Sequence, residues 1–499
     1  MIDGESFLAA LNMLFSSPLP WLIVIPGILI GLVFGAIPGL QISMAMAVFL
    51  PMTLYMDFMQ AMLFLTAIFT GGAFGGSIPA ILMNIPGTSS SIATTFDGYP
   101  MSRRGEHNVA LGVALGASCI GVIVGYSILF LLISPISEIV LKVGPAEMVA
   151  VSLWGIMLIG ALSSRSLLKG VISGLAGLLV ATVGFGEAGV ARGTFGSAYL
   201  IDGIPVIPAM IGMFAASELF RLARENYLVK QDAARRVSIR QVLAGFRQSL
   251  ARPWIVLRGS LIGVFVGAVP GVGSSVANLL SYTAAKRSSS EPDSFGRGNS
   301  DGIVASESAN STSEAGSIAT LLALGIPGGA ATAVMLGAFA MHNITGGPQF
   351  IREETDVVYA IILANFGQAF LLIALGLVVV PLLAHVVKVP MTYLVPSVLA
   401  LVTFGSFGLT GDLTGPVTVL VFSIVGWAFR RYGYSVPAAV VGLLLGDMTE
   451  SSLIYTYQIS GGQWSYLLER PIALLILGLL FASLFGRRLI GLLMPKTSR

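Results

Sequence analysis

Charged residues are scarce in this sequence. Lys, Arg, Asp and Glu account for 10% of its 499 residues, whereas hydrophobic residues account for 55% and the mean hydropathy is +0.88. Because soluble domains carry about 25% charged residues, this composition excludes a soluble globular protein and indicates a polytopic membrane protein. Cysteine is also rare, and the single Cys119 excludes an internal disulfide and a cysteine-based metal site.

Basic residues are absent from the first 102 positions. The N-terminal segment carries Asp3 and Glu5 and lacks the basic region that begins a signal peptide, so we expect this end to face away from the cytoplasm. Between Arg221 and Arg258 the balance reverses to nine basic residues against two acidic ones. Since basic loops stay in the cytoplasm, this run predicts a cytoplasmic linker at 221–252 rather than a nucleic-acid site, with the basic C-terminus on the same side.

Long apolar runs indicate membrane-spanning helices. The runs at 110–134, 357–384 and 471–486 approach or exceed the ~20 residues with which a helix crosses a ~30 Å hydrocarbon layer. They do not alternate in polarity as the strands of a membrane barrel do. We therefore expect an all-α polytopic fold with about 12–14 membrane segments, re-entrant ones included.

Two pairs of motifs mark an internal duplication. GLVFGAIPGL (31–40) aligns without gaps on GVFVGAVPGV (263–272). GGSIPAILMNIPG (75–87) resembles AGSIATLLALGIPG (315–328) with one residue inserted. The two pairs occur in the same order along the chain, which indicates two structural repeats.

The repeats are expected at 1–220 and 253–499, on either side of the linker. The first follows an acidic segment and the second a basic one, so they should enter the membrane from opposite sides. Inverted repeats of this kind recur in secondary transporters, whose substrate sites lie at the repeat interface near the middle of the bilayer.

Each of the four motifs contains Pro-Gly within an apolar segment, at positions 38–39, 86–87, 270–271 and 327–328. Proline kinks or ends a helix because it lacks an N–H, and glycine permits the backbone angles at which the chain can restart. We therefore expect broken or re-entrant helices. Lipid would penalise the freed backbone groups by several kcal/mol each, so the breaks should line a polar cavity enclosed by protein.

Small polar residues follow the breaks. A helix that begins after Pro-Gly directs free N–H groups and about half a positive charge at the break, which predicts an anion site without a basic side chain. The candidates for this site are Ser43, Thr88, Ser89, Ser90, Ser91, Gly271, Ser274, Ser275, Asn278 and Thr332. The alternative for each hydroxyl is a bond to its own helix or packing at a close helix crossing.

Three stretches carry a family resemblance. GGSIPAILMNIPGTSSSIATTFDGYPMSRRG (75–105), GAVPGVGSS (267–275) and ESANSTSEAGSIATLLALGIPGG (307–329) resemble the large permease subunit of the tripartite tricarboxylate transporters. The resemblance runs from about residue 20 to about residue 490. Positions that match the family motifs are Asn84, Pro86, Gly87, Asp97, Glu307, Asn310, Pro327 and Gly328. The sequence departs from the family pattern at Phe74, Ser311 and Thr312, and no Arg follows Glu450 closely.

The resemblance implies uptake of a di- or tricarboxylate across a bacterial inner membrane, driven by an ion gradient. It implies two partners, a periplasmic solute-binding protein and a small membrane subunit of four helices, and it places the N-terminus in the periplasm. It adds Asn84, Pro86, Gly87, Pro327 and Gly328 to the candidate substrate site. Glu307 and Asn310 become candidates for binding the coupling cation, Na⁺ or H⁺. No catalytic residue, metal or other cofactor is expected.

Two other classes of function remain open from the residues alone. In a passive anion channel, the same helix ends would form an anion filter. In an intramembrane serine protease, Ser274 or Ser275 would act with His342. The duplication argues against the protease, because the first copy contains no matching His.

Overall fold

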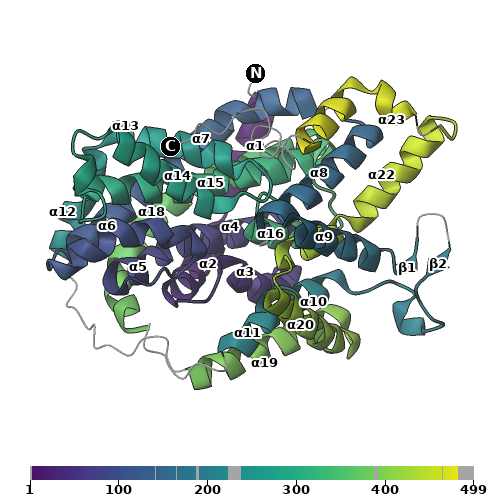
Figure 1. Cartoon of the computed structure of the whole chain (residues 1–499), viewed down its shortest axis with the longest axis horizontal. Coiled ribbons are helices and arrows are strands. Elements are labelled where there is room, and N and C mark those ends of the chain that lie inside the picture. The colour runs from purple at the N-terminus through teal and green to yellow at the C-terminus, as the bar shows by residue number, and fades with distance from the viewer. Residues whose placement is uncertain are drawn as a thin grey trace, which may run out of the picture.

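The structure is a computed structural model, which describes residues 3–140, 142–163, 166–186, 190–222, 238–386, 391–463 and 465–481. These residues form an almost wholly helical body with one short β-hairpin (Figure 1). The prediction of an all-α polytopic membrane protein is confirmed. Four helical segments are long and apolar enough to cross a membrane: Leu19–Ala36, Phe58–Met83, His107–Ile136 and Thr355–Val380. Two bent helix pairs, 239–267 and 436–459, would bring the number to six, and shorter apolar helices accompany them.

The first half of the chain contributes fifteen of the described helical elements and both strands of the hairpin. The elements up to residue 211 are α1 (Gly4–Phe15), α2 (Leu19–Ala36), α3 (Ile42–Phe49), η1 (Leu50–Tyr55), α4 (Phe58–Gly75), α5 (Ser77–Met83), η2 (Ser89–Ser91), α6 (Ile92–Arg103), α7 (His107–Val140), α8 (Pro145–Ser163), α9 (Leu167–Ala181), β1 (Gly184–Phe185), β2 (Ala191–Arg192), η3 (Ala198–Leu200) and α10 (Val206–Ile211). A π-helical turn, η4 (Gly212–Ala216), and α11 (Ser217–Leu222) follow.

The second half is helical throughout its described part. Its elements are α12 (Ile239–Leu250), α13 (Pro253–Gly267), α14 (Gly273–Ser288), η5 (Pro292–Ser294), α15 (Ser300–Leu324), α16 (Ala330–Met341), α17 (Pro348–Glu353), α18 (Thr355–Val386), α19 (Met391–Thr410), α20 (Thr414–Tyr432), α21 (Val436–Leu444), α22 (Gly446–Ile459) and α23 (Tyr466–Glu469).

All four predicted breaks occur. Pro-Gly lies between α2 and α3, between α5 and η2, between α13 and α14, and between α15 and α16. Gly39 and Gly271 have φ angles of 92° and 81°, in the left-handed region that glycine adopts without strain. The helices before the two Ile-Pro-Gly turns also end alike, because Asn84 caps α5 and Gly325 caps α15 with left-handed φ angles of 60° and 69°.

The two halves use the same close helix crossing. The helix α2 packs along α4, and α13 packs along α15. A Cβ atom at Gly31 would lie 2.2 Å from the carbonyl oxygen of Ile68, and one at the aligned Gly263 would lie 2.5 Å from that of Ala309. Glycine is therefore required at matching positions because the helix backbones touch there.

Equivalent helices also pack across the two halves. The helix α1 packs on α18, and its counterpart α12 packs on α7. Likewise α3 packs on α16, and its counterpart α14 packs on η2 and α6. The contacts thus follow one scheme in both halves, as the duplicated motifs suggest. The opposite membrane orientation of the two copies stays a prediction.

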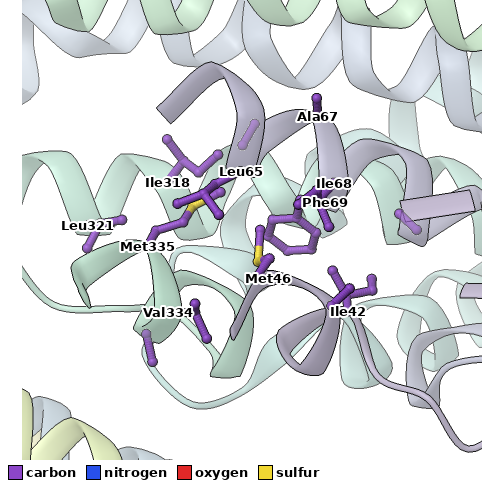
Figure 2. Close-up of a cluster of buried hydrophobic side chains, with 14 of the residues drawn as sticks. Ile42, Met46, Leu65, Ala67, Ile68, Phe69, Ile318, Leu321, Val334 and Met335 are labelled. Carbon is purple, nitrogen blue, oxygen red and sulfur yellow. The ribbon is translucent and has the colours of Figure 1, made fainter. Parts of the chain in front are cut away.

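Apolar side chains from both halves fill the space around the breaks. Figure 2 shows Met46 of α3 and Phe69 of α4 in one cluster with Ile318 of α15 and Met335 of α16. The labelled side chains of this cluster are at most 7% exposed. The turns that follow the Pro-Gly breaks are therefore fixed by a core to which both repeats contribute.

Residues 223–237, about half of the predicted linker, lie outside the described residues. Its C-terminal part forms α12, which packs along α7 and meets α13 at an angle of 78°. Gly112 and Gly245 allow this contact, since a Cβ at Gly112 would lie 1.9 Å from the carbonyl oxygen of Val242. The division at 221–252 stays a prediction, as does its cytoplasmic side.

We expect Gly31→Ala to destabilise the protein by about 1–3 kcal/mol, because the new methyl group meets backbone that cannot move independently. The measurement is the midpoint of thermal unfolding in detergent. The matched control is Gly408→Ala in α19, where a Cβ meets nothing within 4 Å. Equal midpoints for the two variants would contradict the close crossing of α2 and α4.

Candidate functional site

The hydroxyls after the first Ile-Pro-Gly turn form a small cluster. Thr88 Oγ1 lies 3.0 Å from Ser90 Oγ and 3.1 Å from Ser91 Oγ, and all three side chains are buried. They pack against Gly76, where a Cβ would lie 2.4 Å from Thr88 Oγ1. Ser89 is exposed. The four predicted hydroxyls therefore divide into a buried group, in which Thr88 bonds to Ser90 and to Ser91, and the exposed Ser89.

Asn278 joins the two repeats at this point. Its Oδ1 accepts a hydrogen bond of 3.0 Å from the backbone N–H of Ala93, and its Nδ2 donates one of 3.1 Å to the carbonyl oxygen of Ser306. The side chain thereby caps the start of α6 from α14 and also holds α15. One of the free N–H groups expected at this helix start is thus already bonded to protein.

In the second repeat, residues of the Pro-Gly turns form hydrogen bonds with one another. The N–H of Gly271 donates to the carbonyl oxygen of Gly328 at 2.9 Å, which joins the two Pro-Gly turns directly. Pro327 is buried, and Thr332 Oγ1 accepts a hydrogen bond of 3.0 Å from the N–H of Gly329. The predicted Ser274 and Ser275 lie half-buried on the first turn of α14.

The structure brings the candidate substrate residues into two groups. One group combines the Thr88 to Ser91 turn with α14, which carries Ser275 and Asn278. The other consists of the packed helices α3, which carries Ser43, and α16, which carries Thr332. Of the motif residues, Gly87 is buried against Gly35, Pro86 is partly buried, and Asn84 is exposed. Each group contains residues from both repeats.

The two candidates for cation binding lie in the buried helix α15. Glu307 is fully buried, with the hydroxyl of Thr94 donating to Oε1 and that of Ser118 donating to Oε2 at 3.3 Å. Asn310 Nδ2 donates to the carbonyl oxygen of Ala73 at 3.1 Å. These contacts connect α15 with α4, α6 and α7.

Sequence reasoning missed a second buried carboxylate, Glu314, seven residues after Glu307 on the same helix. Its Oε1 accepts hydrogen bonds from Thr70 Oγ1 at 3.0 Å and from the Tyr126 hydroxyl at 3.3 Å. Its Oε2 has no partner among the described residues. The i, i+7 spacing of two acids within ESANSTSEAGS could have identified it, because positions two turns apart share a helix face.

Asp97 also has a role that the motif alone did not reveal. Its Oδ1 accepts three backbone N–H groups, from Gly296 at 2.9 Å and from Gly298 and Asn299 at 2.8 Å each, and its Oδ2 accepts the Tyr282 hydroxyl at 2.9 Å. A carboxylate with four donors is well stabilised in a buried place. Asp97 therefore anchors the loop that leads into α15.

Acids near the ends of other helices are paired with arginine. The pairs are Glu147 with Arg470 at 2.7 Å, Glu218 with Arg430 at 3.1 Å and Glu450 with Arg192 at 2.6 Å. Because each acid is paired with a cation, little net charge remains at these helix ends. No Arg follows Glu450 closely in the sequence. Its arginine partner comes instead from the hairpin strand β2.

Two cavities lie near the hairpin and the end of α16. One of about 410 Å³ is lined by Arg192, Asp202, Asp447 and Glu450 among others, beside the hairpin that projects from the body in Figure 1. The other, of about 770 Å³, is lined by the start of α8, the end of α16 and α22. The predicted substrate residues line neither of these two cavities.

Comparison with known proteins identifies the family. Residues 21–441 match the family model described as "Tripartite tricarboxylate transporter TctA family". The chain belongs to this family. It is similar to the "Uncharacterized 52.8 kDa protein in TAR-I ttuC' 3'region" of Agrobacterium vitis, with 31% identity over 462 residues that cover 91% of this chain and 90% of that protein.

A second relative from Agrobacterium vitis, the "Uncharacterized protein in TAR-II ttuC' 3'region", is 31% identical over 221 residues, which cover 44% of this chain and 90% of that protein. No solved structure matches the chain. The TctA family member described here is therefore a membrane subunit of a tripartite tricarboxylate transporter, and the predicted family resemblance is confirmed.

We expect Asp97→Asn to destabilise this TctA family member by about 2–3 kcal/mol. The amide retains one acceptor oxygen and cannot hold the three N–H groups as a carboxylate does. Thermal unfolding in detergent measures the effect. Asp293→Asn is the matched control, because Asp293 is an exposed acid near the same loop. Similar stability of the two variants would contradict the anchoring role.

Proposed function

We propose that this chain imports a di- or tricarboxylate of the citrate type across the bacterial inner membrane by cation symport. A periplasmic binding protein delivers the substrate, and a small membrane subunit of four helices completes the transporter. Family membership supports the role of a tripartite transporter subunit. The single observation that carries the proposal is the pair of broken segments in each repeat, whose Pro-Gly turns lie inside the fold.

The carboxylate binds where these helices restart. The starts of α3, η2 with α6, α14 and α16 carry small polar residues, and Ser89 presents an exposed hydroxyl beside the buried cluster of Thr88, Ser90 and Ser91. Free N–H groups at a helix start stabilise an anion without a basic side chain. Because each candidate group contains residues of both repeats, movement of one repeat relative to the other would open or close it.

Coupling to a cation has a physical reason. Bringing a divalent anion into the cell against ~100 mV costs roughly 4–5 kcal/mol, so cations must at least offset its charge. Glu307 and Asn310 offer carboxylate and amide oxygens within the buried helix α15. We assign the coupling site for Na⁺ or H⁺ to this helix.

Reconstitution tests the proposal. Proteoliposomes receive this chain, the small membrane partner and the binding protein, together with labelled citrate or other di- and tricarboxylates and an imposed Na⁺ or H⁺ gradient. We expect uphill accumulation that needs all three proteins and ends when one of the two gradients is dissipated. Downhill flux through this chain alone, independent of gradients, would indicate a passive anion channel instead.

A second experiment tests the anion site. Combined replacement of Ser89, Ser90 and Ser91 by alanine should abolish uptake while the protein still inserts, because the turn loses its hydroxyl donors. Ser89→Ala alone should weaken apparent substrate affinity by about tenfold, which corresponds to about 1.4 kcal/mol for one hydrogen bond to a charged group.

The matched control is Ser397→Ala, since this exposed hydroxyl in α19 bonds to its own helix at the carbonyl oxygen of Tyr393. Size-exclusion profiles in detergent show whether each variant is folded. Normal uptake by the folded triple variant would remove the anion site from the first repeat.

A further inference from the structure

Glu314 differs from the other buried acids of the described residues. Asp97 accepts four hydrogen bonds. Glu147 and Glu218 form ion pairs with arginine. Glu307 accepts a hydrogen bond from a hydroxyl at each of its two carboxyl oxygens. Glu314 is fully buried, uses only Oε1, and has no cationic partner in the described part of the chain. An ionised carboxylate in such a place is costly, whereas a neutral carboxyl group is not.

The neighbouring hydroxyl of Thr70 can form a hydrogen bond with both the ionised and the protonated form of Glu314. Thr70 Oγ1 lies 3.0 Å from Glu314 Oε1 and 3.3 Å from Gln368 Oε1. A hydroxyl has a single hydrogen, so it donates to one of these oxygens at a time, and it can accept from the other side. Thr70 can therefore donate to an ionised Glu314, or accept from a protonated Glu314 and donate to Gln368.

The orientation of Gln368 makes this second arrangement available. Its Nε2 donates to Thr66 Oγ1 at 2.8 Å and to the carbonyl oxygen of Leu63 at 3.2 Å. Both amide hydrogens are thus engaged on α4, and Oε1 is left to accept from Thr70. The Thr66 hydroxyl in turn donates to the carbonyl oxygen of Leu63 at 3.1 Å. With a proton on Glu314 Oε1, each side-chain hydrogen-bond donor of Thr66, Thr70, Gln368 and Glu314 therefore has an acceptor.

We propose that Glu314 binds and releases a proton that is transported together with the carboxylate. This inference rests on the proposed symport function. When a proton adds to Oε1, an O–H bond forms there, the carboxyl charge changes from −1 to 0, and the Thr70 hydroxyl rotates to donate to Gln368. Release reverses these steps, and Thr70 itself neither gains nor loses a proton.

Among the described residues, Tyr126 of α7 is the titratable side chain that contacts Glu314. The helix α15 packs against α4, α6, α7, α13, α14, α16, α17 and the turn η2. Glu307 lies two turns away from Glu314, about 10 Å by helical rise. Three charged groups on the packed helices bond to other residues: Asp97 holds residues 296–299, Arg258 bonds to Ser288 and Arg352 to Glu353.

Glu314→Gln tests the proposal in the reconstituted three-protein system, with labelled citrate or another transported di- or tricarboxylate. One coupled proton lets a gradient of one pH unit drive about tenfold accumulation. We expect the variant to lose this accumulation but to keep exchange of labelled for unlabelled substrate, since a permanently neutral side chain needs no proton release. Glu353→Gln is the matched control, because Glu353 is an exposed acid on α17, and it should accumulate substrate like the wild type.

Two further measurements do not depend on a net transport signal from Glu314→Gln. Infrared difference spectra between two pH values should contain a band of a protonated carboxyl group in the wild type that is missing in Glu314→Gln. Thr70→Val, which can neither donate nor accept a hydrogen bond, should slow pH-driven accumulation by about tenfold or more, and Thr70→Ser, which keeps the hydroxyl, should restore it.

The outcomes distinguish a failure of the proposed function from a failure of the role of Glu314. No gradient-driven accumulation by the wild type would overturn the proposed function itself. Accumulation driven by a pH gradient in both the wild type and Glu314→Gln would overturn the role of Glu314 and leave the function standing. Dependence on Na⁺ that is lost in Glu314→Gln would show that the site binds Na⁺ and would overturn the assignment of a proton.

Discussion

Backbone contact at glycine is the constraint on which the rest of this structure depends. It lets α2 approach α4, and α13 approach α15, and it also brings the second Pro-Gly turn of each repeat onto the first crossing. A Cβ at Gly87 would lie 2.1 Å from the carbonyl oxygen of Gly35, and one at Gly328 would lie 2.7 Å from that of the aligned Gly267. Any larger residue would separate the two breaks. The polar residues after the breaks would then no longer gather at common places.

The broken helix ends need polar partners, because lipid offers none. Each repeat obtains some of these partners from the other. Asn278 of the second repeat caps α6 of the first, and the loop before α15 is held by Asp97 of the first. Other ends are completed locally, as by Thr332 at Gly329. The start of α6 in the first repeat therefore depends on a side chain of the second repeat for one of its backbone hydrogen bonds.

The breaks, the long helices α7 and α18 and the duplication were predictable, because proline, glycine and apolar length act locally along the chain. Features that depend on contacts between segments far apart in the sequence were not predictable. Nothing in the order Ser89-Ser90-Ser91 shows that the first side chain is exposed and the next two are buried. The pairing of Glu450 with Arg192 joins residues 258 positions apart. Glu314 was missed because its neighbours Thr70, Tyr126 and Gln368 come from three other helices, and only their packing defines its environment.

The placement of arginine clarifies why α15 differs from the other helices. Every residue from 302 to 323 is buried, including two glutamates, whereas the buried Glu147 and Glu218 near other helix ends have arginine partners. Arginine stays protonated, so it holds a carboxylate permanently ionised. Hydroxyl and amide groups can donate or accept, and they tolerate a carboxyl group in either charge state. A buried acid surrounded only by such groups can change its charge while its neighbours redirect their hydrogen bonds. The proton binding and release that we propose for Glu314 require this property of α15.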